Sequence, residues 1–164
     1  MAVSWTSSTL AACLSGEDTF MACQIEGRDT FLRVCFTPDT AFYRYGPLKS
    51  EPELEISEPV ATLDYRPWPG AGRSIFEDVI FTNEGYRYGV FAGIDRMFDD
   101  ETEDDHPTPR FGGVSVKRGE DTLADLACDR ATVDFDWGEE LFEAKQALGY
   151  SWNSVDRMWV ELPD

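Results

Sequence analysis

From residue 19 onward, apolar and polar residues alternate with the short period of β-strands rather than the longer period of helices. Aromatic and β-branched residues form short runs, and turn residues such as Gly, Pro, Asn and Asp separate them. The pattern predicts strands at 19–25, 30–36, 41–45, 53–57, 60–66, 74–82, 86–94, 112–117 and 122–128. Glycine in the segments 83–85 and 118–121 indicates hairpin turns. Regular short strands of this kind predict a mainly β fold, either an antiparallel β-barrel or a sandwich.

The period changes after residue 137. The segment 138–149 has apolar residues on one helical face, acids in its first turn and a closing glycine, so it predicts one C-terminal α-helix. The tail 150–163 fits a strand, a helical turn or a packed arm equally well. The chain has 164 residues with neither an internal repeat nor a linker, so we expect one β-rich domain over residues 1–164.

The cysteines lie at positions 13, 23, 35 and 128, without the spacing of a zinc site. Their even number fits two disulfides in an oxidising compartment, and the alternative is four buried thiols in a cytosolic protein. If a three-residue loop at 28–30 joins the first two strands, Cys23 faces Cys35 across the ladder. We therefore predict the pairs Cys23–Cys35 and Cys13–Cys128.

A periplasmic or secreted location follows from the predicted disulfides. Residues 1–24 contain neither a basic leader nor a long apolar run, so no signal peptide is visible as the sequence is written. The chain also lacks an apolar stretch long enough for a membrane span, and we expect none.

Acidic residues outnumber basic ones by 32 to 14, which gives a formal net charge of −18. Such a surface repels phosphate backbones and anionic membranes, so nucleic acid is excluded as a partner class. A basic protein or a cation is the natural complement of this charge.

Seven of the acids lie within residues 95–105, between two predicted strands. A segment this polar does not contribute to the core, so we expect an exposed loop that is either merely solvated or a docking surface for a basic partner. A calcium site is a further alternative, but the segment lacks the glycine and the ligand spacing of an EF-hand, and we expect no metal and no cofactor. The predicted binding residues are Asp95, Arg96, Asp99, Asp100, Glu101, Glu103, Asp104 and Asp105.

Catalytic motifs are not visible in the chain. His106 is the only histidine, and no GxSxG-type nucleophile turn occurs, so we predict a protein that is not an enzyme. The glycine pairs at 70–72 and 112–113 do not match a phosphate-binding loop and are interpreted as turns or bulges.

Several segments together resemble a known group of proteins. They are Cys23-x11-Cys35, 42–47 (FYRYGP), 81–88 (FTNEGYRY), 113–116 (GVSV) and 126–128 (LAC). Over residues 20–128 the chain resembles small exported, cysteine-containing β proteins of Gram-negative bacteria. The segment 72–95 is similar to the periplasmic lysozyme inhibitors, all-β modules that plug the active cleft of a lysozyme with a loop. Their short Ser/Gly-rich inhibitory loop has no clear counterpart here, so no inhibitory residue is carried over.

These observations favour binding over catalysis. The resemblance and the charge together suggest an envelope protein that inhibits a basic partner such as a lysozyme-like hydrolase. An immunity protein that neutralises a bacterial toxin and a structural or assembly module remain alternatives. The sequence leaves the oligomeric state open.

Overall fold

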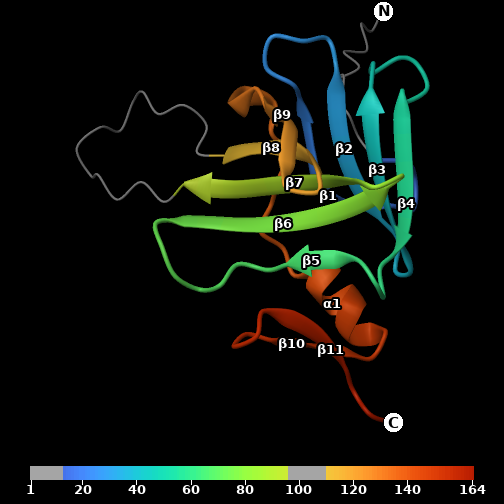
Figure 1. The fold of residues 1–164 in the computed structure, drawn as a ribbon, viewed down its shortest axis with the longest axis vertical. Coiled ribbons are helices and arrows are strands. Elements are labelled where there is room, and N and C mark those ends of the chain that lie inside the picture. The colour runs from blue at the N-terminus through green and yellow to red at the C-terminus, as the bar shows by residue number, and fades with distance from the viewer. Residues whose placement is uncertain (1–12, 96–109) are drawn as a thin grey trace, which may run out of the picture.

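Two antiparallel sheets form the body of the protein, and their strands run across one another (Figure 1). The structure is a computed structural model that describes residues 13–95 and 110–164. The first sheet has the order β1-β2-β3-β4 and the second has the order β5-β6-β7-β8-β9. The sheets do not close into a barrel, so of the two predicted architectures the sandwich is confirmed.

The strands follow the predicted runs closely, with one exception. The first sheet contains β1 (Asp18–Gln24), β2 (Phe31–Phe36), β3 (Thr40–Gly46) and β4 (Leu54–Pro59). The second contains β5 (Asp64–Arg66), β6 (Ser74–Asn83), β7 (Tyr86–Asp95), β8 (Arg110–Arg118) and β9 (Asp121–Ala127). The exception is the predicted strand 60–66, where residues 60–63 form a turn. Val60 and Leu63 are buried in the core, and the turn between them carries the chain from one sheet to the other.

The core lies between the inner faces of the two sheets. Along each strand, alternate side chains point to opposite faces, and the inward set is apolar. Tyr43 of β3 packs against Phe81 of β6, with ring centroids 5.8 Å apart. Val79 and Val90 have no exposed surface. Burial of each such side chain stabilises the fold by about 1.5–3 kcal/mol. Because the buried positions are the apolar ones of the alternating pattern, that pattern was sufficient to predict the class of fold.

The C-terminal part packs at one end of the sandwich, below β5 in Figure 1. After the short helix η1 (Arg130–Thr132), helix α1 (Glu140–Ala147) forms within the predicted segment. The tail is a hairpin of β10 (Tyr150–Asn153) and β11 (Met158–Glu161), so of the three alternatives the strand is correct. Within the described residues, no helix is both long enough and apolar enough to cross a membrane.

The predicted disulfide pairing is wrong. Cys13 bonds to Cys35 and Cys23 bonds to Cys128, each with a Cα–Cα distance of 5.8 Å. The reason is the register of the first hairpin, in which Cys23 faces Leu32 instead of Cys35. The connecting loop is wider than three residues, because the last strand pair is Gln24 with Phe31. Cys35 lies three positions along β2 from Leu32, or about 10 Å, which is too far for a disulfide to Cys23.

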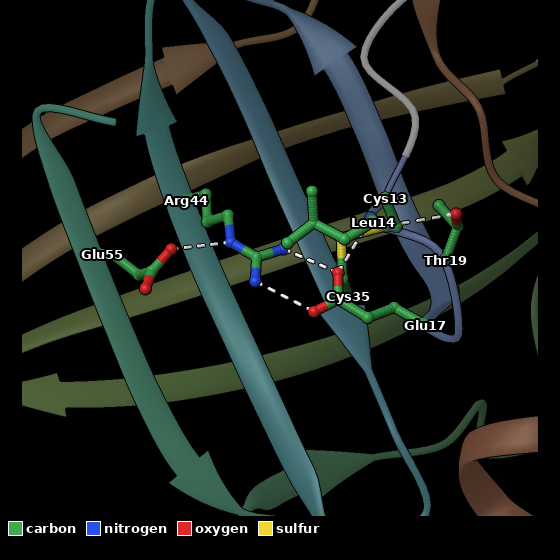
Figure 2. The surroundings of a disulfide bond; sticks show 7 residues. All are labelled: Cys13, Leu14, Glu17, Thr19, Cys35, Arg44 and Glu55. Atoms are coloured by element: carbon green, nitrogen blue, oxygen red, sulfur yellow. Dashed lines mark hydrogen bonds and ion pairs between the residues drawn. A yellow bond between two sulfur atoms is a disulfide. The ribbon is translucent and has the colours of Figure 1, made fainter. Parts of the chain in front are cut away.

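Each disulfide has a distinct place in the fold. Cys23 lies in the core, and its bond to Cys128 joins the first sheet to the segment that follows β9. Cys35 lies between the inward-facing Val34 and Phe36, so its side chain points to the outer face of the first sheet. There it holds Cys13 and the segment before β1 (Figure 2). Two disulfides indicate an oxidising environment outside the cytoplasm.

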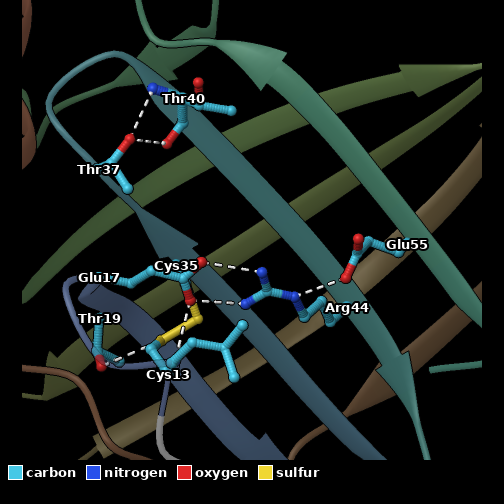
Figure 3. Close-up of polar contacts among 9 residues, drawn as sticks. Cys13, Glu17, Thr19, Cys35, Thr37, Thr40, Arg44 and Glu55 are labelled. Carbon is cyan, nitrogen blue, oxygen red and sulfur yellow. Dashed lines mark hydrogen bonds and ion pairs between the residues drawn. A yellow bond between two sulfur atoms is a disulfide. The ribbon is translucent and has the colours of Figure 1, made fainter. Parts of the chain in front are cut away.

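A buried ion-pair network covers the same outer face (Figures 2 and 3). Arg44 of β3 is 6% exposed, and its two Nη atoms donate to the carboxylate of Glu17 at 2.8 and 2.9 Å. Its Nε donates to Glu55 of β4 at 2.7 Å. The hydrogen bond from Arg44 lowers the pKa of Glu17, so the pair stays ionised. Together with the Cys13–Cys35 bond, this bidentate pair fixes the start of the described chain on the sheet.

Candidate functional site

Two phenylalanine rings lie over glycines on the outer face of the five-stranded sheet. Phe91 of β7 is flanked by the core residues Val90 and Ala92, so it points outward. Phe111 of β8 pairs with Gly93, and Phe91 pairs with Gly113. A Cβ atom on Gly113 would lie 2.8 Å from Cζ of Phe91, and one on Gly93 would collide with the ring of Phe111. The two glycines therefore leave the space in which the rings rest on bare backbone.

A cavity of about 460 Å³ opens above these rings. Its lining residues are Glu26, Phe91, Phe111, Gly112, Ala127, Cys128, Asp129 and Arg130. They come from strands β7 and β8, from the last residue of β9 and the segment that follows it, and from the turn after β1. The cavity therefore lies where the two sheets meet, and its size is typical of small binding sites.

Backbone hydrogen bonds hold the walls of the cavity in place. The N–H of Glu26 donates to the carbonyl of Ala127 at 2.9 Å, and the N–H of Asp129 donates to that of Gln24 at 2.8 Å. The Cys23–Cys128 bond joins the same two segments covalently. These contacts make the site a fixed part of the scaffold, so binding does not require the two segments to be ordered first.

The charged groups around the cavity leave an excess of negative charge. Arg130 lies over the Phe111 ring at 5.8 Å and donates to Asp95 at 3.2 Å, so its charge is balanced. Glu26 and Asp129 are both exposed and contribute two further carboxylates. Carboxylates beside the faces of aromatic rings favour a cationic group, since both attract positive charge.

The predicted acidic segment begins at the edge of this site. Asp95, the last residue of β7, accepts hydrogen bonds from Ser74 at 2.7 Å and from Arg130. The first residue of β8, Arg110, pairs with Ile94 of β7 and donates to the carbonyl of Phe135 at 2.8 Å. The described residues on either side of 96–109, Asp95 and Arg110, are therefore both anchored near the cavity. The other predicted binding residues lie outside the described residues: Arg96, Asp99, Asp100, Glu101, Glu103, Asp104 and Asp105.

The structure adds four residues that the sequence analysis missed: Glu26, Phe91, Phe111 and Asp129. The interpretation of Gly112 and Gly113 as a turn or bulge is wrong, because both lie in regular pairing within β8. The available signal was the spacing of Phe and Gly in the two strands, FAG at 91–93 and FGG at 111–113. Its meaning depends on the β7–β8 register, which the sequence does not specify.

A buried acid lies at the other end of the sandwich, near helix α1. Glu77 is 3% exposed, and the hydroxyl of Tyr65 donates to its carboxylate. Burial raises the pKa of Glu77 to about 7, and the charges of Asp78 and Glu140 act in the same direction. Glu77 therefore changes its charge near neutral pH, which affects the stability of the fold.

Metal-ligating groups also gather in one place among the described residues. Cys13, Glu17 and Cys35 offer ligand atoms that lie within 4.8 Å of one another. However, the two sulfur atoms form a disulfide, and Arg44 binds both oxygens of the carboxylate. In this state the cluster stabilises the fold and does not hold a metal.

Comparison of the chain with protein-family models, with curated protein sequences and with solved structures found no match in any of the three.

Proposed function

We propose that the protein is a non-catalytic binding protein of the periplasm or the extracellular space, and that it captures a basic protein. Lysozyme-like hydrolases are the partner class that we would test first. The observation that carries the proposal is the cavity over Phe91 and Phe111, with the carboxylates of Glu26 and Asp129 at its rim.

The shape and charge of the cavity fit an arginine or lysine side chain. The apolar stem or the guanidinium plane packs on a phenylalanine ring, and the charged head pairs with Glu26 or Asp129. A cavity of about 460 Å³ accommodates more than one such side chain. The proposal is thus an anchor for basic side chains on a rigid sheet.

The net charge of −18 supports the same partner class. A strongly acidic surface attracts a basic protein over a distance of several ångströms and raises the association rate, and salt screens this attraction. The acidic segment 95–105, which begins at the end of β7, adds to this effect through its seven acids. We expect the segment to steer the partner and the cavity to hold it.

Titration of the protein with a strongly basic lysozyme, followed by isothermal calorimetry at several salt concentrations, tests the proposal. We expect a complex at low ionic strength whose affinity falls steeply as salt is added. Inhibition of the lysozyme in a cell-wall lysis assay would show whether capture blocks the active cleft. If neither a lysozyme nor any basic protein from a periplasmic extract binds at low salt, the proposal is wrong.

The variant Glu26→Gln with Asp129→Asn tests the site itself. Each exposed ion pair contributes up to about 1 kcal/mol, so we expect the affinity to fall about threefold to thirtyfold. The matched control is Glu120→Gln with Asp121→Asn, which removes the same charge from the β8–β9 turn and the first residue of β9, at the other end of these strands. Equal losses for the two double variants would mean that general charge, and not the cavity, attracts the partner.

A further inference from the structure

A second cavity, of about 410 Å³, lies between the C-terminal hairpin and β5. Its lining residues are Ala61, Thr62, Leu63, Asp64, Tyr65, Arg66, Lys145, Tyr150, Trp152, Arg157, Met158 and Trp159. The cavity is separate from the site over Phe91 and Phe111, since the two share no lining residue. The further inference concerns this cavity and does not depend on the proposed function.

Basic residues outnumber acidic ones around this cavity, although the protein as a whole is strongly acidic. Among the described residues that line it, three are basic, namely Arg66, Lys145 and Arg157, and one is acidic, Asp64. Asp64 is paired with Arg66 at 3.3 Å. Asp78 also interacts with these cations. Burial raises its pKa, and the charges of Arg66 and Arg157 partly offset that rise. Even with Asp78 included, cations outnumber acids here on a chain whose net charge is −18.

Lys145 of helix α1 is the most unusual of these groups, because it is only 1% exposed. Its Nζ donates to the carbonyl of Ala61 at 3.3 Å and lies 5.5 Å and 5.3 Å from the ring centroids of Tyr150 and Trp159. None of these partners carries a negative charge. Among residues 13–95 and 110–164, Asp64 acts on Lys145 through its charge but no carboxylate forms an ion pair with its Nζ. A buried ammonium group of this kind is stabilised when an anion enters beside it.

The other side of the cavity is aromatic. Trp152 and Trp159 face each other across the β10–β11 ladder, with ring centroids 5.4 Å apart. The indole N–H of Trp159 donates to the carbonyl of Tyr65 at 2.8 Å, which fixes that ring against β5. Indole rings bind planar or C–H-rich rings by stacking and burial of apolar surface, and here Trp159 is held in place for such a contact.

We propose that this cavity binds a small carboxylate that carries a ring. The carboxylate lies beside Lys145 and Arg157, and the ring packs against Trp152 and Trp159. A sugar acid and an aromatic acid share this chemistry, so the experiment compares both. The cationic groups and the indole rings line the same cavity, so a ligand with both a carboxylate and a ring uses both kinds of contact.

The test is an NMR titration of the protein with glucuronate and with benzoate, monitored at the indole N–H signals of Trp152 and Trp159. The neutral probes glucose and benzyl alcohol are the matched controls for the two rings. We expect at least one acid to bind with saturation, and its neutral counterpart to bind about tenfold more weakly or not at all. A stronger response to glucuronate identifies a sugar acid, and a stronger response to benzoate identifies an aromatic acid. No saturable binding of either acid at about 10 mM would overturn the proposal, as would equal binding of acid and neutral probe.

The variant Arg157→Asn assigns the binding to this cavity. Arg157 is exposed and has a positive φ of 53°, a conformation that asparagine adopts readily, so this variant should fold normally. We expect it to weaken binding of the preferred acid about tenfold. The control Arg28→Asn removes the same charge from the β1–β2 turn, and it should leave binding unchanged. Equal affinities for the two variants would place the acid elsewhere and contradict the proposal.

Discussion

The buried pair of Glu77 and Tyr65 makes the stability of the fold depend on pH in a defined direction. Burial raises the pKa of Glu77 from an ordinary value of 4.5 to about 7 in the folded protein. An acid with a raised pKa favours folding while it is protonated, so its contribution is fully present below pH 4.5. The contribution is lost as pH rises through 7. A shift of this size corresponds to about 3 kcal/mol.

The substitution Glu77→Gln isolates this contribution. Glutamine has the same shape, accepts the hydrogen bond from Tyr65 and does not titrate. We expect the variant and the parent protein to be about equally stable near pH 4.5. At pH 8 the variant should be more stable by up to about 3 kcal/mol, because the parent then holds a buried charge.

Urea denaturation followed by tryptophan fluorescence at pH 4.5, 6 and 8 measures both stabilities. The difference between the two proteins removes the contribution of the many other acids, including Glu17, which titrate in both. As a second variant, Tyr65→Phe removes the donor that lowers the pKa of Glu77, so the loss of stability should extend to higher pH. A difference between parent and Glu77→Gln that stays constant from pH 4.5 to 8 would refute the reasoning.

Three further predictions follow from the fold. Replacing both Cys23 and Cys128 by alanine should destabilise the protein by about 4–5 kcal/mol, because this disulfide closes a long loop. Replacing Cys13 and Cys35, whose disulfide closes a shorter loop, should destabilise it by about 3 kcal/mol. Urea denaturation measures both losses. The substitution Gly113→Ala should lower the melting temperature, because the added methyl group collides with the backbone carbonyl of Leu126 and with the Phe91 ring. An unchanged melting temperature would contradict the close packing described around Gly113. Burial lowers the pKa of Lys145 to about 8, so stability should rise between pH 8 and 10.5, and this rise should be absent in Lys145→Met when the two are compared by denaturation.

Much of the fold was predictable because a β-strand has a period of two and each strand carries its own pattern. The runs at 74–82 and 86–94 became β6 and β7 almost residue for residue. Of the strand predicted at 60–66, only residues 64–66 form a strand, β5. Val60 and Leu63 reach the core from a turn, and burial alone does not distinguish a turn from a strand. The tail stayed ambiguous because the positions of its tryptophans are compatible with a strand, a helical turn or a packed arm. The contact of Trp159 with β5, which accompanies the hairpin, is not visible in the sequence.

The disulfides and the site depended on strand register, which the sequence does not specify. A wider first loop moved Cys23 opposite Leu32 and changed the pairing of both disulfides. In the same way, the cavity depends on the β7–β8 register, which pairs Phe91 with Gly113. Only Asp95 among the predicted binding residues lies in the described part of the chain, and it is held by Arg130 at the rim of the cavity.

The most direct test of the account is a hydrogen-exchange footprint of the complex with a basic lysozyme. Binding over Phe91 and Phe111 should slow amide exchange at the two edges of the cavity, in residues 24–26 and 127–130, and at the adjoining ends of β7 and β8. The β8–β9 turn at residues 119–120 should exchange as it does in the free protein. Protection of that turn without protection of the cavity edges, or no protection at any position, would contradict the proposal that this cavity captures a basic partner.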